Sequence, residues 1–343
     1  MIRESLLYEP LNNSDVRCHM CLRRCTISVG QRGYCGTRRN REGRLYSLAY
    51  GRVVVQHVAP IEIKPLFHFY PGSRAFSLGS HGCNFKCPGC QNWDIAHQEP
   101  RENGEEGQYI SPEEAVFLAK EHGCQGISWT YNEPTLWFEY TLDGAKLAKQ
   151  AGLYTNYVTN GYMSPEALDL IGPYLDAFRV DIKGFRPKTY KKIANVTNVG
   201  ELLKVVERAK GKWGMWVEVV TNIIPGYNDD VDELKDIAAW IVTRLGEETP
   251  WHVTRFVPHF KLSHVQKTHA KTLEKAKEIG HEQGLRFVYL GNIPGHPAEN
   301  TYCDRCGKLL IERHRYSILT YTLRDHSCPC CGNEIPLVGT CVS

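Results

Sequence analysis

The chain has 343 residues, of which 42% are hydrophobic and 23% are charged, and its formal net charge is +3. This composition predicts a soluble globular protein with one main domain and small appendages, and the mild charge gives no indication of a nucleic-acid or membrane partner. No apolar run approaches the roughly 20 residues needed to cross a bilayer. The fourteen cysteines form close pairs and the first ten residues lack an apolar signal core, so we expect a reducing, cytoplasmic compartment.

The first chemical feature along the chain is a group of four cysteines. Cys18, Cys21 and Cys25 are followed, after a glycine turn, by Cys35. Zinc held by all four thiolates is the simplest assignment, with a second iron–sulfur cluster or free buried thiols as alternatives. Residues 17–44 also contain eight arginines and only one acid. This segment therefore carries a positive face, which is either a plain solvated surface or a contact for phosphate or carboxylate.

Short apolar runs broken by prolines follow in residues 45–69, as is typical of edge strands or a strand-rich connector. Pro71 and Gly72 then mark the boundary of the main domain. Beyond it, apolar β-branched runs alternate with helical stretches that begin at Ser111, Ser164 and Asp230. The strand-like runs are residues 75–78, 126–130, 154–159, 177–182, 215–224, 253–257 and 286–290. This alternation predicts an α/β fold of parallel βαβ units, a partial or full TIM-type barrel of about six to eight strands.

Three cysteines, Cys83, Cys87 and Cys90, lie close together between glycines and directly after the first predicted barrel strand. A C-x3-C-x2-C run can ligate three irons of a cubane [4Fe–4S] cluster and leave the fourth iron open to a small molecule. A zinc knuckle is the alternative, with His81 or His97 as its fourth ligand. Chemistry in such barrels sits at the carboxyl ends of the strands, which is where this loop begins.

This loop resembles the cluster loop of the radical S-adenosylmethionine (SAM) superfamily, and most of all that of the glycyl-radical-enzyme activating branch, which includes pyruvate formate-lyase activase. The resemblance implies that SAM chelates the open iron and that an electron from a donor such as flavodoxin or ferredoxin cleaves SAM to a 5′-deoxyadenosyl radical. Relatives place an aromatic residue before the third cysteine to touch adenine, whereas this chain has Gly89. Phe85 or Trp93 is the expected substitute.

The resemblance also assigns SAM contacts to polar residues at strand ends. Glu133 matches the carboxylate of a Gly-Gly-Glu motif that holds the ammonium of SAM, although the two glycines are replaced. The alternative is that Glu133 caps the next helix. Thr159 and Asn160 match the family's Asp-Thr-Asn-Gly turn. The alternative is that these residues only form a plain Asn-Gly turn without a role in SAM binding. Val158 stands in place of the aspartate, so the resemblance does not extend to the monovalent cation that relatives bind there.

Asp181 and Lys183 are two residues apart, so strand alternation puts them on one face with Arg179 beside them. Buried charges need partners, so these side chains should contact each other or a zwitterionic ligand. In the family the Asp-x-Lys pair lies against SAM, and a surface ion pair is the alternative. The resemblance further implies a ribose or carboxylate contact for Asn222 and a ribose contact for His259, which is displaced by one position. The alternative for His259 is a substrate-facing or merely exposed histidine.

Near the end of the chain, two C-x2-C-G knuckles flank a strand-like segment. This spacing predicts a zinc ribbon formed by Cys303, Cys306, Cys328 and Cys331, with Cys330 as an alternative ligand to Cys331. Zinc ribbons usually hold protein or nucleic-acid partners.

The sequence thus divides into an N-terminal cysteine-rich extension and connector (1–70), a radical SAM core (71–295) and a zinc ribbon (296–343). The whole arrangement resembles the radical SAM member of the AmmeMemoRadiSam group, which implies companions of the AMMECR and Memo families. We expect an enzyme that abstracts hydrogen from a substrate, such as a glycyl backbone or another protein segment. The alternatives are a radical SAM enzyme that modifies RNA through its basic knuckles, and a non-catalytic metal-binding adaptor.

Overall fold

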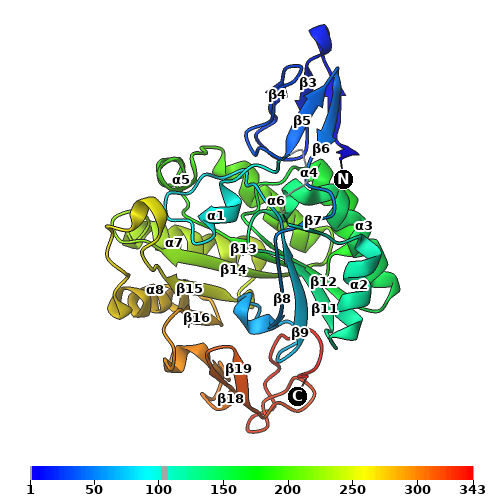
Figure 1. Ribbon diagram of the computed structural model, residues 1–343. Coiled ribbons are helices and arrows are strands. Elements are labelled where there is room, and N and C mark those ends of the chain that lie inside the picture. Colours follow the sequence, from blue (N-terminus) through cyan, green and yellow to red (C-terminus); the bar gives the residue numbers. More distant parts are fainter. Residues whose placement is uncertain (1, 102–106, 343) are drawn as a thin grey trace.

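The computed structural model describes residues 2–101 and 107–342, and an eight-stranded sheet forms its centre (Figure 1). The strands follow the order β16-β15-β14-β13-β12-β11-β9-β8. Neighbours from β9 to β16 are parallel, whereas β8 runs antiparallel to β9 at one edge. The strands are β8 (Val55–Pro60), β9 (Arg74–Gly79), β11 (Gly126–Trp129), β12 (Tyr154–Thr159), β13 (Ala177–Asp181), β14 (Trp216–Ile223), β15 (Trp251–Arg255) and β16 (Val288–Gly291).

Helices connect the parallel strands. The Ser111, Ser164 and Asp230 side chains accept hydrogen bonds from backbone N–H groups three residues ahead, which confirms the three predicted helix starts. The helices are α1 (Trp93–Ala96), α2 (Pro112–Glu121), α3 (Phe138–Gln150), α4 (Pro165–Ile171), α5 (Pro187–Ala194), α6 (Val199–Gly211), α7 (Val231–Trp240) and α8 (Ala270–Glu282). Short helical turns are η1 (Asn12–Ser14), η2 (Ile61–Ile63), η3 (Pro134–Trp137), η4 (Gly172–Tyr174), η5 (Ile241–Leu245), η6 (Phe260–Leu262) and η7 (Pro297–Glu299).

The predicted α/β fold is confirmed, and it takes the form of a partial barrel. Every predicted strand run in the main domain overlaps a parallel strand of the sheet. The hydrogen-bonded order ends at β8 on one side and at β16 on the other, so the sheet within the described residues is open. Because β8 pairs with β9 along its whole length, the core sheet begins before the boundary predicted at residue 71.

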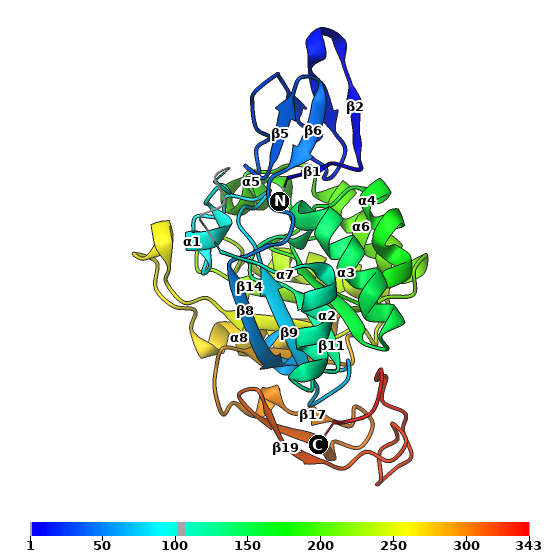
Figure 2. The same ribbon diagram turned by 45° about the vertical axis from the view of Figure 1, so that its right-hand side comes forward.

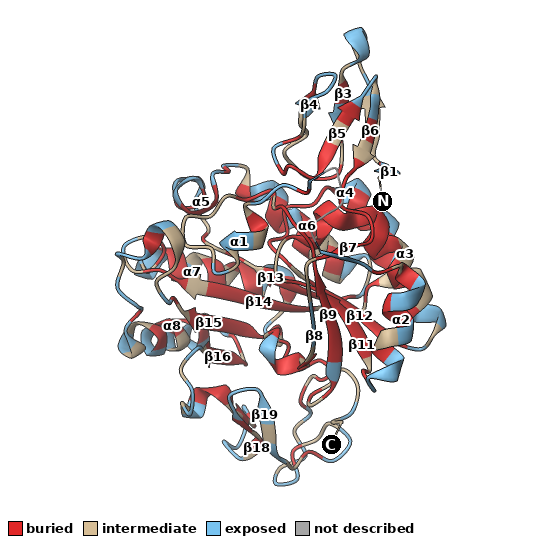
Figure 3. Cartoon of the chain, in the orientation of Figure 1, coloured by how far each residue is buried: buried red, intermediate tan, exposed pale blue. Residues whose placement is uncertain are grey.

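The two faces of the sheet differ in chemistry. Successive strand residues point to opposite faces, and one face, with Phe76 and Leu78, belongs to the main hydrophobic cluster beneath the helices. The alternate positions carry Ser77, Asn156 and Arg179, which are buried as well. The central strands are accordingly coloured as buried along most of their length (Figure 3). A polar interior of this kind needs internal hydrogen-bond partners or a ligand.

The N-terminal extension forms two small antiparallel sheets that stand at one end of the barrel (Figures 1 and 2). It contacts the loop after β12, where Cys21 makes a β-bridge with Met163. The buried Arg38 side chain forms an ion pair with Glu139 of α3. Its strands are β1 (Arg3–Glu4), β2 (Tyr8–Pro10), β3 (Val16–Cys18), β4 (Thr26–Ile27), β5 (Arg38–Arg41) and β6 (Arg44–Ser47), and β7 (Arg52–Val53) pairs with β10 (Gln108–Tyr109).

The C-terminal segment lies at the opposite end of the barrel and forms the three-stranded sheet β17 (Thr301–Tyr302), β18 (Leu309–His314) and β19 (Ser317–Tyr321) (Figure 2). A buried network fastens it to the barrel. Glu218 of β14 accepts hydrogen bonds from the His68 backbone N–H and from His252, and His68 contacts the Tyr289 hydroxyl. Tyr289 in turn is hydrogen-bonded to Thr301.

Within residues 2–101 and 107–342, no helix combines the length and the apolar character needed to cross a bilayer.

Candidate active site

The central cysteine loop runs from the carboxyl end of β9 to α1, at the same end of the sheet as the N-terminal extension (Figure 1). Cys83, Cys87 and Cys90 are partly buried and are not disulfide-bonded. Asn160 follows β12, and its Nδ2 atom donates a hydrogen bond to Asn84 Oδ1 at 2.8 Å. The same Nδ2 atom lies 3.8 Å from Cys83 Sγ. The loop is thus fastened to the neighbouring strand end.

Burial controls the ionisation of these thiols. Desolvation raises the pKa of Cys83 well above its ordinary value, and it raises the pKa of Cys90 to about 11. The pKa of Cys87 is also raised by burial, while the ammonium of Lys183 opposes the shift. The free thiols therefore hold their protons at neutral pH, and a metal group that binds them must displace these protons.

Asp181 and Lys183 lie near Cys87 at the carboxyl end of β13. Asp181 accepts hydrogen bonds from Arg179 Nη1 at 2.7 Å and from Lys183 Nζ at 3.3 Å, which confirms the prediction that these charged residues contact one another. Burial raises the pKa of Asp181, but Arg179 and Lys183 outweigh this effect and hold the pKa below its usual value. The Asp181 side chain is 30% exposed, so a ligand can still reach it.

Asn222 lies at the carboxyl end of β14 and has a side-chain oxygen that is unpaired in the described chain. Its Oδ1 atom is buried and has no hydrogen-bond partner within the described residues. A buried acceptor without a donor is costly, so it is an atom to which a bound ligand can donate. Of the two predicted contacts, ribose and carboxylate, this acceptor atom fits the ribose of SAM, whose hydroxyl groups can donate to it.

Glu133 differs from the sequence prediction of a carboxylate that faces SAM. It is 1% exposed, and it accepts hydrogen bonds from the Thr135 N–H and hydroxyl, the Thr159 hydroxyl and the Asn160 N–H. The oxygens of Glu133 are therefore occupied by protein groups. In this structure Glu133 joins the end of β11 to the end of β12, and it also caps η3 through Thr135, which was the alternative prediction.

The loop after β15 packs against Pro88 and Gly89, the two residues before the third cysteine, a feature that the sequence alone did not reveal. A Cβ atom on Gly89 would lie 3.0 Å from Leu262 Cδ1 and 3.1 Å from Phe256 Cε2. The Lys261 N–H also donates to the Pro88 carbonyl at 3.0 Å. A larger side chain at position 89 would have to displace Leu262 and Phe256, which fits the presence of glycine where relatives have an aromatic residue.

The residues expected to replace that aromatic group, and His259, lie around this loop. Phe85 is buried against Tyr162 and therefore belongs to the packing of the loop. Trp93 is 44% exposed and stacks on Phe260, with ring centres 4.9 Å apart. His259 is the N-cap residue of η6 and is partly exposed beside this stack. Trp93 therefore stays the candidate for the adenine contact, and His259 stays the candidate for the ribose contact.

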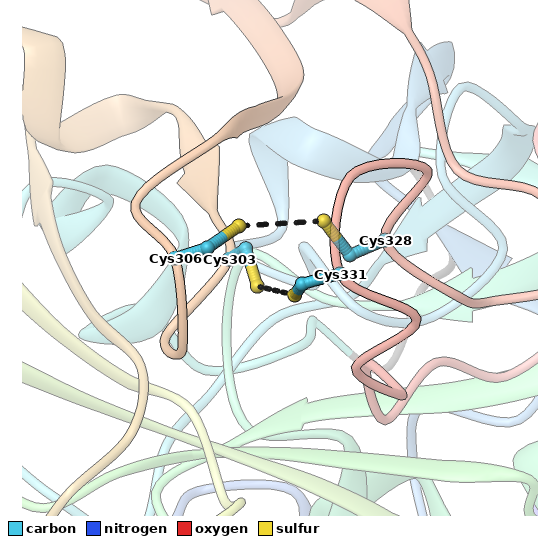
Figure 4. Close-up of side chains that lie close together, drawn as sticks. All are labelled: Cys303, Cys306, Cys328 and Cys331. Carbon is cyan, nitrogen blue, oxygen red and sulfur yellow. Dashed lines mark hydrogen bonds between the residues drawn. The ribbon is translucent and has the colours of Figure 1, made fainter.

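The C-terminal cysteines form a compact site (Figure 4). The Sγ atoms of Cys303 and Cys331 are 3.6 Å apart, and those of Cys306 and Cys328 are 3.7 Å apart. All four lie within 4.8 Å of one another. This spacing fits a single tetrahedral ion, since a Zn–S bond of about 2.3 Å places the sulfurs about 3.8 Å apart. Cys330 is exposed and lies outside this group.

Cys83, Cys87 and Cys90 have a different spacing. Within the described residues, only the four C-terminal cysteines form a group of ligand atoms that all lie within 4.8 Å. The central triplet is therefore wider than a single-ion site. Three thiols on one loop, which form no compact group with a fourth ligand among the described residues, could hold three irons of a cubane cluster and leave the fourth iron open.

Comparisons with known proteins agree with this geometry. Residues 78–241 match the radical SAM superfamily. The chain is 43% identical over 339 residues to an uncharacterized protein of Methanocaldococcus jannaschii, a match that covers 98% of this chain and 100% of the relative. The chain belongs to the radical SAM superfamily. Membership implies a [4Fe–4S] cluster and SAM as cofactors.

More distant relatives of this radical SAM protein are informative too. A second protein of Methanocaldococcus jannaschii, provisionally named a glycyl-radical enzyme activating enzyme, is 25% identical over 223 residues, which is 64% of this chain and 80% of the relative. A radical SAM methyltransferase structure from Sphaerobacter thermophilus has a TM-score of 0.51 at 14% identity and covers 67% of this chain and 71% of that chain. This structural likeness supports the partial-barrel fold.

Proposed function

We propose that this protein is a radical SAM enzyme in which Cys83, Cys87 and Cys90 hold the [4Fe–4S] cluster, while Asp181 and Lys183 bind SAM. One observation carries the proposal: the cysteine loop begins at the carboxyl end of β9, and Asp181 and Lys183 lie at the carboxyl end of β13, so the triplet and the charged pair share one edge of the parallel sheet. An anion and a cation side by side match the ammonium and carboxylate of a methionine moiety.

When bound, the cluster and SAM supply the radical chemistry, in which one electron cleaves SAM to methionine and a 5′-deoxyadenosyl radical that abstracts hydrogen from the substrate. The protein binds and orients the reactants. Asp181 can accept hydrogen bonds from the ammonium of SAM, and Lys183 can donate to its carboxylate. Asn222 offers the buried Oδ1 to a SAM hydroxyl. The loop with Phe256 and Leu262 covers one side of the cysteine loop and excludes water there.

We further propose that the substrate is a protein segment, for which a glycyl backbone is the first candidate. The support is the similarity to the relative provisionally named a glycyl-radical enzyme activating enzyme. A flavodoxin or ferredoxin as electron donor, and companions of the AMMECR and Memo families, belong to the same proposal. Zinc in the C-terminal ribbon is proposed from the spacing of its sulfurs.

The arginines of the N-terminal extension give little support to the RNA alternative. Arg38 is 1% exposed and paired with Glu139, so phosphate cannot reach it. Arg24 is paired with Glu166 at 2.7 Å. Arg17 and Arg32 are likewise paired with protein carboxylates. Much of the positive charge counted in the sequence is therefore neutralised within the protein.

The proposed function is tested by measuring 5′-deoxyadenosine release from SAM by anaerobically reconstituted protein with a strong reductant. A variant with Cys83→Ala, Cys87→Ala and Cys90→Ala should release none. The exposed Cys330 provides a matched control, and Cys330→Ala should retain the activity of the unmodified protein. If the intact protein contains the cluster but does not cleave SAM, with or without candidate protein substrates, the proposed activity is wrong.

A further inference from the structure

The N-terminal extension contacts both neighbours of Cys83 in the central cysteine loop. Gly82 precedes Cys83 and has a φ of +89°, and a Cβ atom on it would lie 2.8 Å from the Cys35 carbonyl oxygen. Only glycine fits such a position without strain. Asn84 follows Cys83, and its carbonyl oxygen accepts a hydrogen bond from Arg23 Nε at 2.7 Å. The first cysteine of the loop is therefore held between two residues that the extension contacts.

The four N-terminal cysteines form the part of the extension that lies nearest to this loop. A single small cavity is lined by Arg23, by Asn84 and by all four cysteines, namely Cys18, Cys21, Cys25 and Cys35. Within the described residues, these thiols do not form a compact ligand group like that of the C-terminal ribbon, so zinc at this site stays a prediction. Arg23 thus lines the cavity of the N-terminal cysteines and also reaches the central cysteine loop.

Several contacts fix the Arg23 side chain in place. Its guanidinium carbon lies over the Tyr34 ring, 3.6 Å from the ring centre, and its Nη2 atom donates to the Asn195 carbonyl at 3.3 Å. The Asn195 side chain in turn donates to the Tyr34 hydroxyl at 3.4 Å. A planar guanidinium that stacks on a ring and donates to two carbonyls has little freedom to move. The positive charge of Arg23 therefore has a defined position beside the cysteine loop.

This charge is not paired with a carboxylate. Arg17, Arg24 and Arg38 of the same extension each form an ion pair with a protein carboxylate. Arg23 forms no ion pair within residues 2–101 and 107–342, and its hydrogen bonds go to backbone carbonyl oxygens. Its charge is therefore available to act on a charged group in the neighbouring loop.

A [4Fe–4S] cluster held by three thiolates is such a group. The cluster with its ligands is negatively charged when oxidised, and it gains one more negative charge when it accepts an electron. A fixed positive charge nearby stabilises the reduced form more than the oxidised form, because the attraction grows with the charge of the cluster. Such a charge therefore raises the reduction potential.

We propose that Arg23 is a positioning residue for the central cluster, which fixes the loop at Asn84 and raises the reduction potential of the cluster through its charge. The step that it favours is the transfer of one electron from the donor to the cluster, in which no bond forms or breaks. This inference rests on the proposed cluster at Cys83, Cys87 and Cys90. It gives the N-terminal extension, which lies outside the residues matched to the superfamily, a role in how readily the cluster accepts its electron.

The test uses the full chain with its cluster reconstituted anaerobically. Iron is measured per chain, and the reduction potential is measured by a redox titration in which EPR follows the reduced cluster. For Arg23→Gln, the ratio of reduced to oxidised cluster at a fixed solution potential should fall by about three- to tenfold, a shift of about 30–60 mV to lower potential. Arg23→Lys keeps the charge and should have nearly the potential of the unmodified protein.

Arg24→Gln is the matched control. It removes the same charge from the adjacent residue, but Arg24 is paired with Glu166 at 2.7 Å. We expect an unchanged potential in this variant. An unchanged potential in Arg23→Gln, or an equal decrease in Arg24→Gln, would overturn the proposal.

If Arg23→Gln does not retain iron, Arg23→Lys decides the question. Iron retained in Arg23→Lys at the potential of the unmodified protein supports the proposal, and any other result contradicts it. Loss of iron from both variants would show that Arg23 serves only the fold of the loop. Absence of iron from the unmodified protein would overturn the proposed function as well, whereas a bound cluster that is insensitive to Arg23 would overturn this inference alone.

Discussion

Asn84 and Asn160 are joined by a buried hydrogen bond, in which Asn160 Nδ2 donates to Asn84 Oδ1 at 2.8 Å. This bond ties the cysteine loop to the end of β12. Asn160→Ala leaves the Asn84 oxygen unsatisfied, which should lower the free energy of unfolding by about 1–3 kcal/mol and reduce the iron bound by the loop. Chemical denaturation and iron analysis measure these effects, with Asn12→Ala on the surface as the control. Unchanged stability and iron content would contradict this role.

Asp181→Asn should weaken SAM binding by about 10- to 100-fold, because a charge-assisted hydrogen bond to the ammonium of SAM is lost. The comparison is Asp236→Asn, which removes a carboxylate that is paired with Arg186 at the surface. Equilibrium dialysis of SAM with cluster-loaded protein measures the affinity, and iron content shows whether the cluster is retained. If Asp181→Asn binds SAM normally, Asp181 serves only to pair Arg179 and Lys183.

The ion pair of Arg38 and Glu139 fastens the N-terminal extension to the core. Two guanidinium nitrogens each lie 2.9 Å from a carboxylate oxygen, and the side chains are 1% and 2% exposed. Arg38→Met leaves a buried carboxylate unpaired and should cost about 3–5 kcal/mol of stability. The double variant Arg38→Met, Glu139→Gln should recover part of this loss. A double variant that is as unstable as the sum of both single variants would show that the two residues are not energetically coupled.

Lys64 makes the stability of the protein depend on pH. Its side chain is 4% exposed, and its ammonium lies 4.9 Å from the centre of the Tyr131 ring, with no carboxylate partner in the described chain. Burial, together with the charge of Arg179, lowers the pKa of Lys64 from 10.5 to about 7. Between these two values the unfolded chain binds a proton that the folded chain lacks, so this residue makes stability fall as the pH decreases from about 10.5 to 7.

Lys64→Met should therefore stabilise the protein near pH 7 by on the order of a few kcal/mol. The gain should shrink as the pH approaches 10, where the unfolded chain also begins to lose the proton. Thermal unfolding over this pH range measures the effect, with the exposed Lys271→Met as the control. A stability difference that does not change with pH would show that Lys64 is charged in the folded protein.

Cys331 and Cys330 are adjacent, but only Cys331 belongs to the compact sulfur group. Cys331→Ser should reduce bound zinc from about one ion per chain to nearly none and destabilise the ribbon, because structural zinc supplies folding free energy. Cys330→Ser should leave both properties unchanged. Zinc analysis and limited proteolysis of the ribbon distinguish the two variants. Equal zinc loss in both would show that the spacing of the free thiols does not define the ligands.

Features that depend on local pattern could be predicted from the amino-acid sequence. Alternating apolar runs and capping residues such as Ser111 and Ser164 indicated the order of strands and helices, because these preferences act within a few residues. The spacing of Cys83, Cys87 and Cys90 indicated the cluster loop, since a metal group restricts how far apart its ligands can be along the chain. The prediction that Asp181 and Lys183 face the same way followed from strand geometry.

Features that depend on contacts between distant segments became visible only in the folded chain. Three contacts join residues that are far apart in sequence. Thr159 donates a hydrogen bond to the buried Glu133, Leu262 packs against Gly89, and Arg38 forms an ion pair with Glu139. Sequence spacing shows that thiols can meet, but the distance between their sulfurs, and hence the metal group that fits, is set by how the surrounding segments pack.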